Sequence, residues 1–224
     1  MTTETIVRRD APPRLTLLPR TVPATPMPRW KRALDLALVV PALVVTLPLQ
    51  LAIAGAIVVD SRGAPLYRHV RVGRGGQHFT CWKFRSMIKD AHALREQLAD
   101  QNEANGVIFK MREDPRRTRV GRWLRRTSLD ELPQLWNIAA GHMTIVGPRP
   151  PLPEEVIHYS DEQLRRVAGT PGLTGLWQVR ARARHDFDEM VALDVEYLAR
   201  ITLLGDLKII LATIPTVLGG RGSY

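Results

Sequence analysis

Residues 36–59 read LALVVPALVVTLPLQLAIAGAIVV and hold 24 consecutive uncharged side chains. A helix needs roughly 20 apolar residues to cross the hydrocarbon core of a bilayer, so this stretch is long enough to do so. Pro48 lies at its centre, and Pro41 lies about two turns earlier. A proline inside a helix removes a backbone hydrogen bond and bends the helix. The stretch therefore predicts a membrane helix that is kinked at Pro48.

Basic residues flank the apolar stretch on both sides, namely Arg29, Lys31 and Arg32 before it and Arg62, Arg68, Arg71 and Arg74 after it. Because positive charge favours the cytoplasmic side, these flanks indicate no direction of crossing. A straight span and a re-entrant helix that bends at Pro48 and returns to the cytoplasmic side both fit the pattern. Asp35 lies just inside the run, where a charge needs a partner. Lys31 or Arg32 could be that partner, and helical spacing favours Lys31, four residues earlier.

The composition is that of a folded protein with an anionic partner. The 224 residues are enough for one domain with an appendage, and 45% of them are hydrophobic. A single cysteine excludes a disulfide framework and a cysteine-based metal site. The net charge of +10 is concentrated in residues 62–126, which carry 16 basic and 6 acidic side chains. Nucleic acid, anionic lipid and a nucleotide-linked substrate all fit this charge pattern.

The first 29 residues contain six prolines together with several arginines and threonines. Such a segment cannot bury enough apolar surface to fold, so residues 1–29 are predicted to form a flexible arm. A cleaved signal peptide is not expected, because the apolar stretch starts only after residue 32 and no small-residue cleavage site follows it.

Short strands and a surface helix are predicted after the apolar stretch. Residues 64–87 predict two strands around the glycine-rich turn at Gly73, Gly75 and Gly76. A basic glycine-rich turn can cradle phosphate, but a simple hairpin turn is the favoured interpretation. Residues 88–104 predict an amphipathic surface helix, because apolar side chains recur at helical spacing at Ile88, Ala91, Leu94 and Leu98.

Residues 110–126 are rich in Lys and Arg and include Trp123 and Leu124. A nucleic-acid-binding protein would use such a run to follow phosphates. A membrane protein would place the tryptophan at headgroup level and the arginines on anionic lipid. The run is also compatible with a solvated basic surface. The apolar stretch upstream favours the membrane interpretation.

Residues 127–137 read TSLDELPQLWN and bring two carboxylates together. Ser128 and Glu131 have the spacing of a capping box, and Pro133 suits a first helical turn. Asp130 and Glu131 would thus lie near a helix N-terminus, where phosphate groups bind. One carboxylate can attack phosphorus while the other holds Mg²⁺. For an isolated pair, two acids that merely start a helix are the favoured alternative.

Residues 145–151 read IVGPRPP, and their presence favours a catalytic role for the two carboxylates. The prolines make a rigid, extended turn and lack backbone donors of their own, and Arg149 is the charged donor of this turn. An arginine suits bidentate contact with phosphate. The alternative is a proline-rich loop whose arginine faces solvent.

Taken together, the motifs resemble those of the bacterial sugar transferases, monotopic phosphoglycosyl transferases that act on polyprenyl phosphate and start surface-glycan assembly. The resemblance covers residues 30–224, nearly the whole chain. The blocks that carry it are KRALD (31–35), Pro48, KFRSM (83–87), RRTSLDELPQLWN (125–137), VGPRP (146–150), PGLTGLWQV (171–179), DLKIILATIPTVL (206–218) and RGSY (221–224).

The resemblance implies an α/β, mostly α-helical, monotopic membrane protein. Residues 30–61 would form a re-entrant membrane helix broken at Pro48, and residues 62–224 a small catalytic module on the cytoplasmic face of the bacterial inner membrane. Amphipathic helices over 114–126 and 203–218 would dock along the membrane interface. The amino-terminal arm stands where longer members carry further membrane helices, so the chain resembles the catalytic module alone.

The resemblance also assigns roles to site residues. Asp130 would be the nucleophile and Glu131 the Mg²⁺ ligand. Arg149 would contact the nucleotide diphosphate, and Lys83 and Arg85 would be further anion contacts.

The implied reaction transfers a sugar-1-phosphate from a UDP-hexose to undecaprenyl phosphate and releases UMP through a phosphosugar–aspartate intermediate. It would be the first membrane step of exopolysaccharide or other surface-glycan assembly. The expected partners are the UDP-sugar, the polyprenyl phosphate and membrane lipid, with a homodimer as a candidate assembly. A non-catalytic membrane-docked scaffold is the alternative. A nucleic-acid-binding role is not expected, because no recognisable nucleic-acid motif accompanies the apolar stretch.

The sequence departs from the family pattern at one residue and in one three-residue segment. His142 stands where an acid is common, and Arg180, Ala181 and Arg182 stand where Ser-Gly-Arg is frequent. The first difference removes a candidate acidic helper. The second bears on the binding of the sugar or the lipid phosphate.

Overall fold

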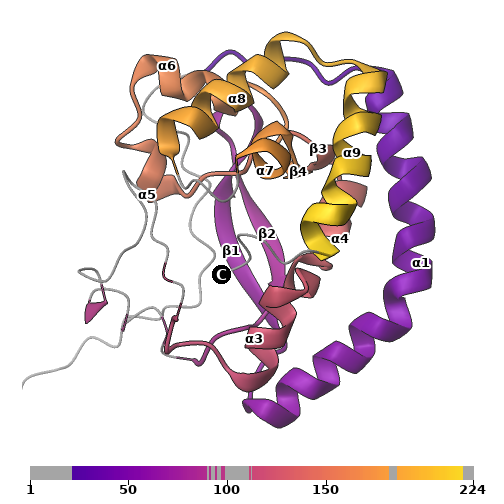
Figure 1. Cartoon of the computed structure of the whole chain (residues 1–224), viewed down its shortest axis with the longest axis vertical. Coiled ribbons are helices and arrows are strands. Elements are labelled where there is room, and N and C mark those ends of the chain that lie inside the picture. Colours follow the sequence, from indigo (N-terminus) through magenta and orange to yellow (C-terminus); the bar gives the residue numbers. More distant parts are fainter. Residues whose placement is uncertain are drawn as a thin grey trace, which may run out of the picture.

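The computed structural model of this protein describes residues 22–89, 91, 94, 97–98, 111, 113–181 and 186–218. Within these residues the chain is mostly helical and has two two-stranded sheets. One helix is much longer and more apolar than the rest, which is compatible with a monotopic membrane protein. The other elements form a folded module along one side of that helix (Figure 1).

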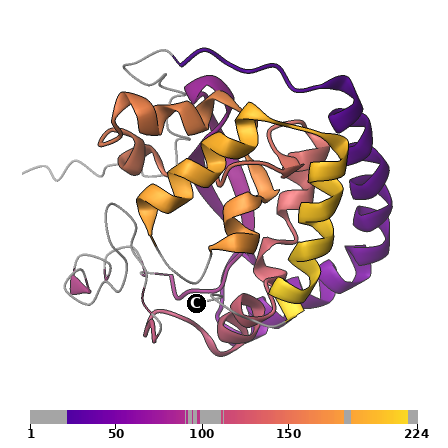
Figure 2. The same cartoon turned by 45° about the horizontal axis from the view of Figure 1, so that its top comes forward.

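The long helix is α1 (Arg29–Asp60), and its bounds agree with the predicted segment 30–61. Helical structure continues through Pro41 and Pro48, while the axis of the helix bends between its two ends (Figure 1, Figure 2). Prolines within a helix cause such bends because each one removes a backbone donor.

Only one stripe of α1 is covered by protein. The stripe includes Val39, Leu43, Ile53 and Ile57, which recur at helical spacing and are buried in the module. Most of the other large apolar side chains of α1 are exposed, at Leu38, Val40, Val44, Val45, Leu47, Leu49, Leu51, Val58 and Val59. Such an extensive apolar surface indicates contact with lipid.

Both ends of α1 are tied to the module by polar contacts. Near the first end Lys31 forms a buried ion pair with Asp206, and Asp35 Oδ1 accepts a hydrogen bond from the backbone N–H of Ile145 at 3.0 Å. The predicted pairing of Lys31 with Asp35 is therefore wrong, because each side chain finds its partner in the module. At the other end Asp60 Oδ2 accepts from the backbone N–H of Val120 at 3.0 Å.

The strands β1 (Leu66–Val72) and β2 (His78–Phe84) pair antiparallel and confirm the hairpin predicted over 64–87. The glycine-rich segment forms a tight turn, in which the backbone N–H of Gly73 donates to the carbonyl of Gln77 at 2.6 Å. Gly75 and Gly76 have positive φ angles of 67° and 81°, which explains the need for glycine there.

A second sheet joins two motifs that are distant in the sequence. Strands β3 (Thr144–Val146) and β4 (Gly172–Thr174) are parallel. A Cβ added to Gly172 would lie 2.1 Å from the backbone nitrogen of Gly147, so this close approach requires glycine. The VGPRP and PGLTG blocks are therefore neighbours in space.

The remaining elements surround the hairpin (Figure 1). They are α3 (Arg119–Arg126), the 3₁₀ turn η3 (Leu129–Glu131), α4 (Gln134–Ala139), α5 (Pro153–Val156), α6 (Asp161–Leu164), η4 (Arg165–Ala168), α7 (Leu176–Arg180), α8 (Phe187–Ala199) and α9 (Leu203–Leu218).

The two predicted interfacial helices differ in outcome. The helix expected over 203–218 is α9, and its exposed side chains include Leu203, Leu204, Leu207, Leu211 and Ile214. The helix expected over 114–126 starts only at Arg119, because Thr118 caps it and Asp114 is held in a turn by Arg116.

Two further predictions fall largely outside the described residues. Most of the helix expected over 88–104 lies there, as do residues 1–21 of the predicted arm. Residues 22–28 of that arm are extended, and the backbone N–H of Thr25 donates to the carbonyl of Ala168 at 2.8 Å. This part of the arm lies against the module.

Candidate active site

The two predicted catalytic carboxylates lie in the short turn η3 between α3 and α4. Ser128 enters this turn with a left-handed backbone, φ 57°, and its hydroxyl has no hydrogen-bond partner among the described residues. The predicted capping box between Ser128 and Glu131 is therefore wrong. A left-handed residue cannot adopt the extended backbone of an N-cap, and Glu131 turns towards β2 instead.

Glu131 forms an ion pair with Lys83, whose Nζ lies 2.6 Å from Oε1 of the carboxylate. Both side chains are partly exposed, at 23% for Lys83 and 31% for Glu131. The structure thus brings one of the predicted anion contacts to the predicted metal ligand, and the pair remains open to a ligand from solvent.

Asp130 is much more enclosed, with 8% of its surface exposed. Burial raises the pKa of its carboxyl to about 6, and the charge of Glu131 adds to this effect, while Lys83 and Arg125 oppose it. At neutral pH the carboxylate is therefore mostly ionised and poorly solvated. These properties suit a nucleophile.

The loop that carries Arg149 is held in place through its backbone. Arg71 Nη1 donates to the carbonyl of Pro150 at 3.0 Å, and the backbone N–H of Val72 donates to the carbonyl of Pro151 at 3.0 Å. Arg166 Nη2 donates to the carbonyl of Arg149 itself at 3.2 Å. Arg149 itself is half-buried.

Several charged side chains gather around the buried thiol of Cys81. Burial raises the pKa of Cys81, whereas Lys83, Arg71 and Arg149 lower it and Glu131 raises it. All four charges therefore lie near one point on β2. Burial and the charge of Arg149 also lower the pKa of Arg71 to about 10. The result is a basic site with carboxylates at its edge, which suits a substrate that carries several phosphates.

Arg85 is placed differently from Lys83. Its guanidinium donates to the backbone carbonyl of Ser61 and, at 3.0 Å, to the hydroxyl of the same residue. These contacts fasten the carboxyl end of α1 to the end of β2. The predicted substrate contact of Arg85 stays a prediction.

Three residues that position the Arg149 loop were not found from the sequence. Arg71 lies between two valines in β1. In the sequence it was noted only as one of the basic residues that follow the apolar stretch. Arg166 and Asp194 form a buried ion pair at 2.6 Å, with each side chain 1% exposed. Their separation of 28 residues leaves no local pattern that could have indicated the pair.

Of the residues that depart from the family pattern, His142 and Arg180 lie on the surface, whereas Ala181 is buried in a hydrophobic cluster. His142 is exposed, and its ring stacks on that of Phe79 with centroids 6.1 Å apart. Arg180 is exposed and pairs with Glu196 at 3.3 Å. Arg182 lies outside the described residues.

The carboxylates of Asp130 and Glu131 suit Mg²⁺. Among the described residues, no group of three or more His, Cys, Asp or Glu side chains is arranged to hold a metal. Mg²⁺ does not require such a group, because proteins usually bind it through one or two carboxylates together with water and substrate phosphates. The adjacent acids of η3 provide such carboxylate oxygens.

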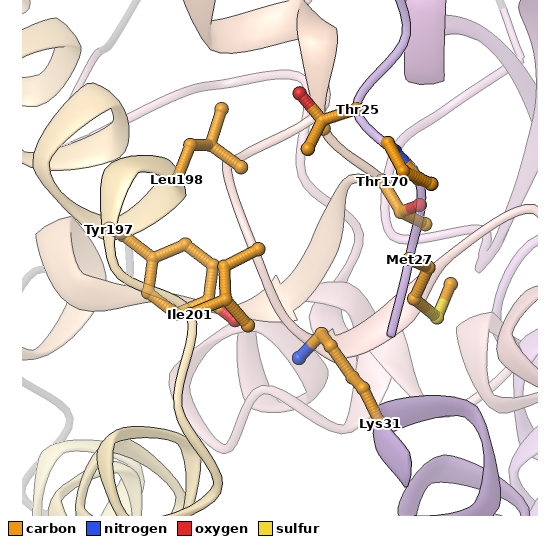
Figure 3. Close-up of a pocket in the computed structure, with 9 residues that line it drawn as sticks. Thr25, Met27, Lys31, Thr170, Tyr197, Leu198 and Ile201 are labelled. Carbon is orange, nitrogen blue, oxygen red and sulfur yellow. The ribbon is translucent and has the colours of Figure 1, made fainter. Parts of the chain in front are cut away.

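A small hollow lies elsewhere in the module, beside Lys31 and Tyr197 (Figure 3). Its volume is about 10 Å³, which is enough for about one water molecule. It is too small for a sugar nucleotide and belongs to the packing between the start of α1 and the end of α8.

The sequence matches the family model described as "Bacterial sugar transferase" over residues 27–220. The chain belongs to the bacterial sugar transferase family. The match includes η3, both small sheets and the membrane helix.

Three relatives illustrate the range of the family. The chain is 40% identical to the exopolysaccharide production protein ExoY of Sinorhizobium fredii over 87% of this chain and 88% of that protein. It is 44% identical to the galactosyl transferase CpsE of Streptococcus agalactiae over 72% of this chain and 36% of that protein. It is 40% identical to the undecaprenyl-phosphate galactose phosphotransferase of Salmonella typhimurium over 87% of this chain and 41% of that protein. The chain thus spans well under half of these two longer relatives.

Proposed function

We propose that this protein transfers a sugar-1-phosphate from a UDP-hexose to undecaprenyl phosphate and releases UMP. The observation that carries the proposal is the buried carboxylate of Asp130 beside the Lys83–Glu131 pair. The relatives named as galactose and glucose phosphotransferases of undecaprenyl phosphate support the same reaction class. The step would begin exopolysaccharide or other surface-glycan assembly.

In the first step, an Asp130 oxygen attacks the phosphorus that bears the sugar. A bond forms between that oxygen and phosphorus, and the bond from this phosphorus to the bridging oxygen breaks. UMP leaves with the electron pair of the broken bond, and a phosphosugar ester remains on Asp130. Arg149 and Lys83 hold the phosphate oxygens and offset their negative charge.

In the second step, a phosphate oxygen of undecaprenyl phosphate attacks the phosphorus of the ester. The bond to Asp130 breaks, and the carboxylate is regenerated with its charge. The product is a sugar linked to the lipid by a diphosphate. The two steps use one nucleophile in turn, so both substrates must reach Asp130.

Glu131, with Asp130 next to it, would hold Mg²⁺. The ion would shield phosphate charge from the attacking carboxylate. Lys83 forms an ion pair with Glu131. If Mg²⁺ were bound to Glu131, the ammonium group of Lys83 could instead contact a phosphate of the substrate.

The contacts of α1 support a re-entrant topology in the cytoplasmic leaflet of the inner membrane. A helix of 32 residues is about 48 Å long, against a bilayer core of about 30 Å. Lys31 near one end and Asp60 at the other both bond to the same module. A straight span would carry one of these ends away from the module. The exposed apolar residues of α9 and Trp123 would dock along the same leaflet.

The test measures UMP release from UDP-sugars with and without undecaprenyl phosphate and Mg²⁺. UDP-glucose, UDP-galactose and their N-acetylated forms are the substrates to compare. We expect a stoichiometric burst of UMP without the acceptor and continuous turnover with it. A protein that releases no UMP with any of these sugars, yet binds membranes, would instead be a scaffold.

A further inference from the structure

A groove of about 430 Å³ lies between the second half of α1 and α3. Figure 1 shows these two helices side by side at the end of the molecule that carries the carboxyl end of α1. The residues that line the groove are Ile53, Ala56, Asp60, Arg119, Val120 and Trp123. Its volume falls in the range of about 300–1,000 Å³ that is typical of ligand sites.

The chemistry of the groove suits an apolar chain. Ile53, Ala56 and Val120 supply an aliphatic surface, and the half-exposed ring of Trp123 forms one wall. Asp60 is the acid of the groove, and its Oδ2 accepts a hydrogen bond from the backbone N–H of Val120 at 3.0 Å. Four of the six lining residues are apolar, which suits a hydrocarbon chain better than a nucleotide base or a sugar, since these need several polar partners.

The groove continues into surfaces that fit a lipid. Val59, three residues after Ala56 on α1, is 86% exposed. On the α3 side, Arg119, Arg122 and Arg126 are exposed, and Arg126 is the last residue of α3, so this row of cations extends from the groove towards the turn that carries Asp130. An amphiphile with a long apolar chain and an anionic end matches this arrangement.

The groove is also linked to the candidate nucleophile. Leu124, on α3, is fully buried in a hydrophobic cluster with Ile53 and Ile57, and Leu129 packs against that cluster. Leu129 is the neighbour of Asp130 in the chain, and α3 ends four residues before Asp130. A chain that occupies the groove would therefore have its end near the turn that carries the carboxylates.

We propose that this groove binds the isoprenoid chain of the polyprenyl phosphate acceptor, with the phosphate directed towards Asp130. The inference rests on the proposed function, because it assigns a site to the second substrate of that reaction. It gives the acceptor its own place, apart from the polar site of the nucleotide sugar around Arg149 and Lys83.

The test fills the groove and compares it with a matched change outside it. Ala56 and Ala52 are exposed on α1 one turn apart, and Ala56 lines the groove whereas Ala52 does not. Ala56→Phe should raise the KM for undecaprenyl phosphate about tenfold. Ala52→Phe should leave this KM within about twofold of the parent protein. Thermal melts of both variants in the same detergent show whether each has folded.

Two further measurements distinguish an effect on acceptor binding from an effect on the first step of the reaction. The burst of UMP without acceptor should be unchanged in Ala56→Phe, because the nucleotide sugar does not use the groove. The KM for a short acceptor such as geranyl phosphate should rise less than the KM for undecaprenyl phosphate. A parent protein without a burst would contradict the proposed function, whatever the variants do.

Two results would overturn the groove assignment while leaving the proposed function intact. One is an unchanged KM for undecaprenyl phosphate in a folded Ala56→Phe. The other is a loss of binding to phosphatidylglycerol vesicles without polyprenyl phosphate in Ala56→Phe alone, because the groove would then bind bulk phospholipid.

Discussion

Nζ of Lys83 lies 2.6 Å from Oε1 of Glu131, across 48 residues of sequence. The ion pair joins strand β2 to the turn η3 and brings an ammonium group close to the buried carboxyl of Asp130. Lys83 thereby opposes the effect of burial on that carboxyl. Three side chains from two distant motifs thus form one electrostatic unit, and their individual roles can be tested.

Asp130→Asn should abolish turnover and stabilise the fold at neutral pH. An amide cannot form the phosphoester.

The folded protein raises the pKa of Asp130 to about 6, so the stability that this group contributes is present at pH below about 4 and is lost as the pH rises through 6. Removal of the charge at pH 7.5 should recover up to about 3 kcal/mol. Thermal melts at pH 7.5 and pH 4 check this, since the gain should vanish at pH 4. Turnover by Asp130→Asn, with deamidation excluded by mass spectrometry, would contradict the nucleophile assignment.

The UMP burst should depend on pH with a midpoint near 6, because only ionised Asp130 can attack. Lys83 lowers the pKa of Asp130, so Lys83→Met should shift the midpoint to higher pH. Lys89→Met is the control, because Lys89 is an exposed lysine of the same region and is not paired with Glu131. Burst amplitudes and rates from pH 5 to 9 give the midpoints. An equal shift in both variants would argue against a specific effect of Lys83.

Glu131→Gln should sharply raise the Mg²⁺ concentration needed for activity or abolish the activity. A neutral amide is a weaker ligand than a carboxylate, and Lys83 loses its anionic partner. A Mg²⁺ titration of UMP release is the measurement. An unchanged titration would restrict Glu131 to a structural role in η3.

Arg149→Lys should raise the KM for the UDP-sugar about tenfold, because a lysine cannot make two parallel hydrogen bonds to a phosphate. The loop backbone should persist, since Arg71 and Arg166 hold its carbonyl groups. Arg200→Lys is the matched control, because Arg200 is exposed at the carboxyl end of α8 and belongs to none of the site motifs. Equal KM values for the two variants would remove Arg149 from the substrate site.

A cysteine at position 5 should resist an impermeant thiol reagent in intact cells. Residues 1–30 and the module are expected on the same, cytoplasmic side, because both ends of α1 bond to the module. Cys81 is buried and can be left in place, so the parent protein is the background control. Pro48→Leu should straighten the helix in part of the population and expose position 5. Labelling of the variant that retains Pro48 would indicate an ordinary single span.

The sequence alone determined the features that depend on neighbouring residues. The uncharged run 36–59 predicted α1, and the glycine cluster within 64–87 predicted the hairpin. The motif around Asp130 and Glu131 placed the carboxylates near the start of a helix. Hydrophobic runs, glycine turns and prolines act over a few residues, so their effects can be read locally.

Only the tertiary structure decided the partners of the polar side chains. Lys31 pairs with Asp206 rather than with Asp35, and Glu131 pairs with Lys83 rather than with Ser128. Likewise, no local pattern predicted the buried Arg166–Asp194 ion pair, whose arginine donates to the backbone of the Arg149 loop. Burial and charge pairing depend on which distant segments meet and how much water they exclude. The pKa of Asp130, and with it the chemistry proposed for this residue, is therefore a property of the assembled module.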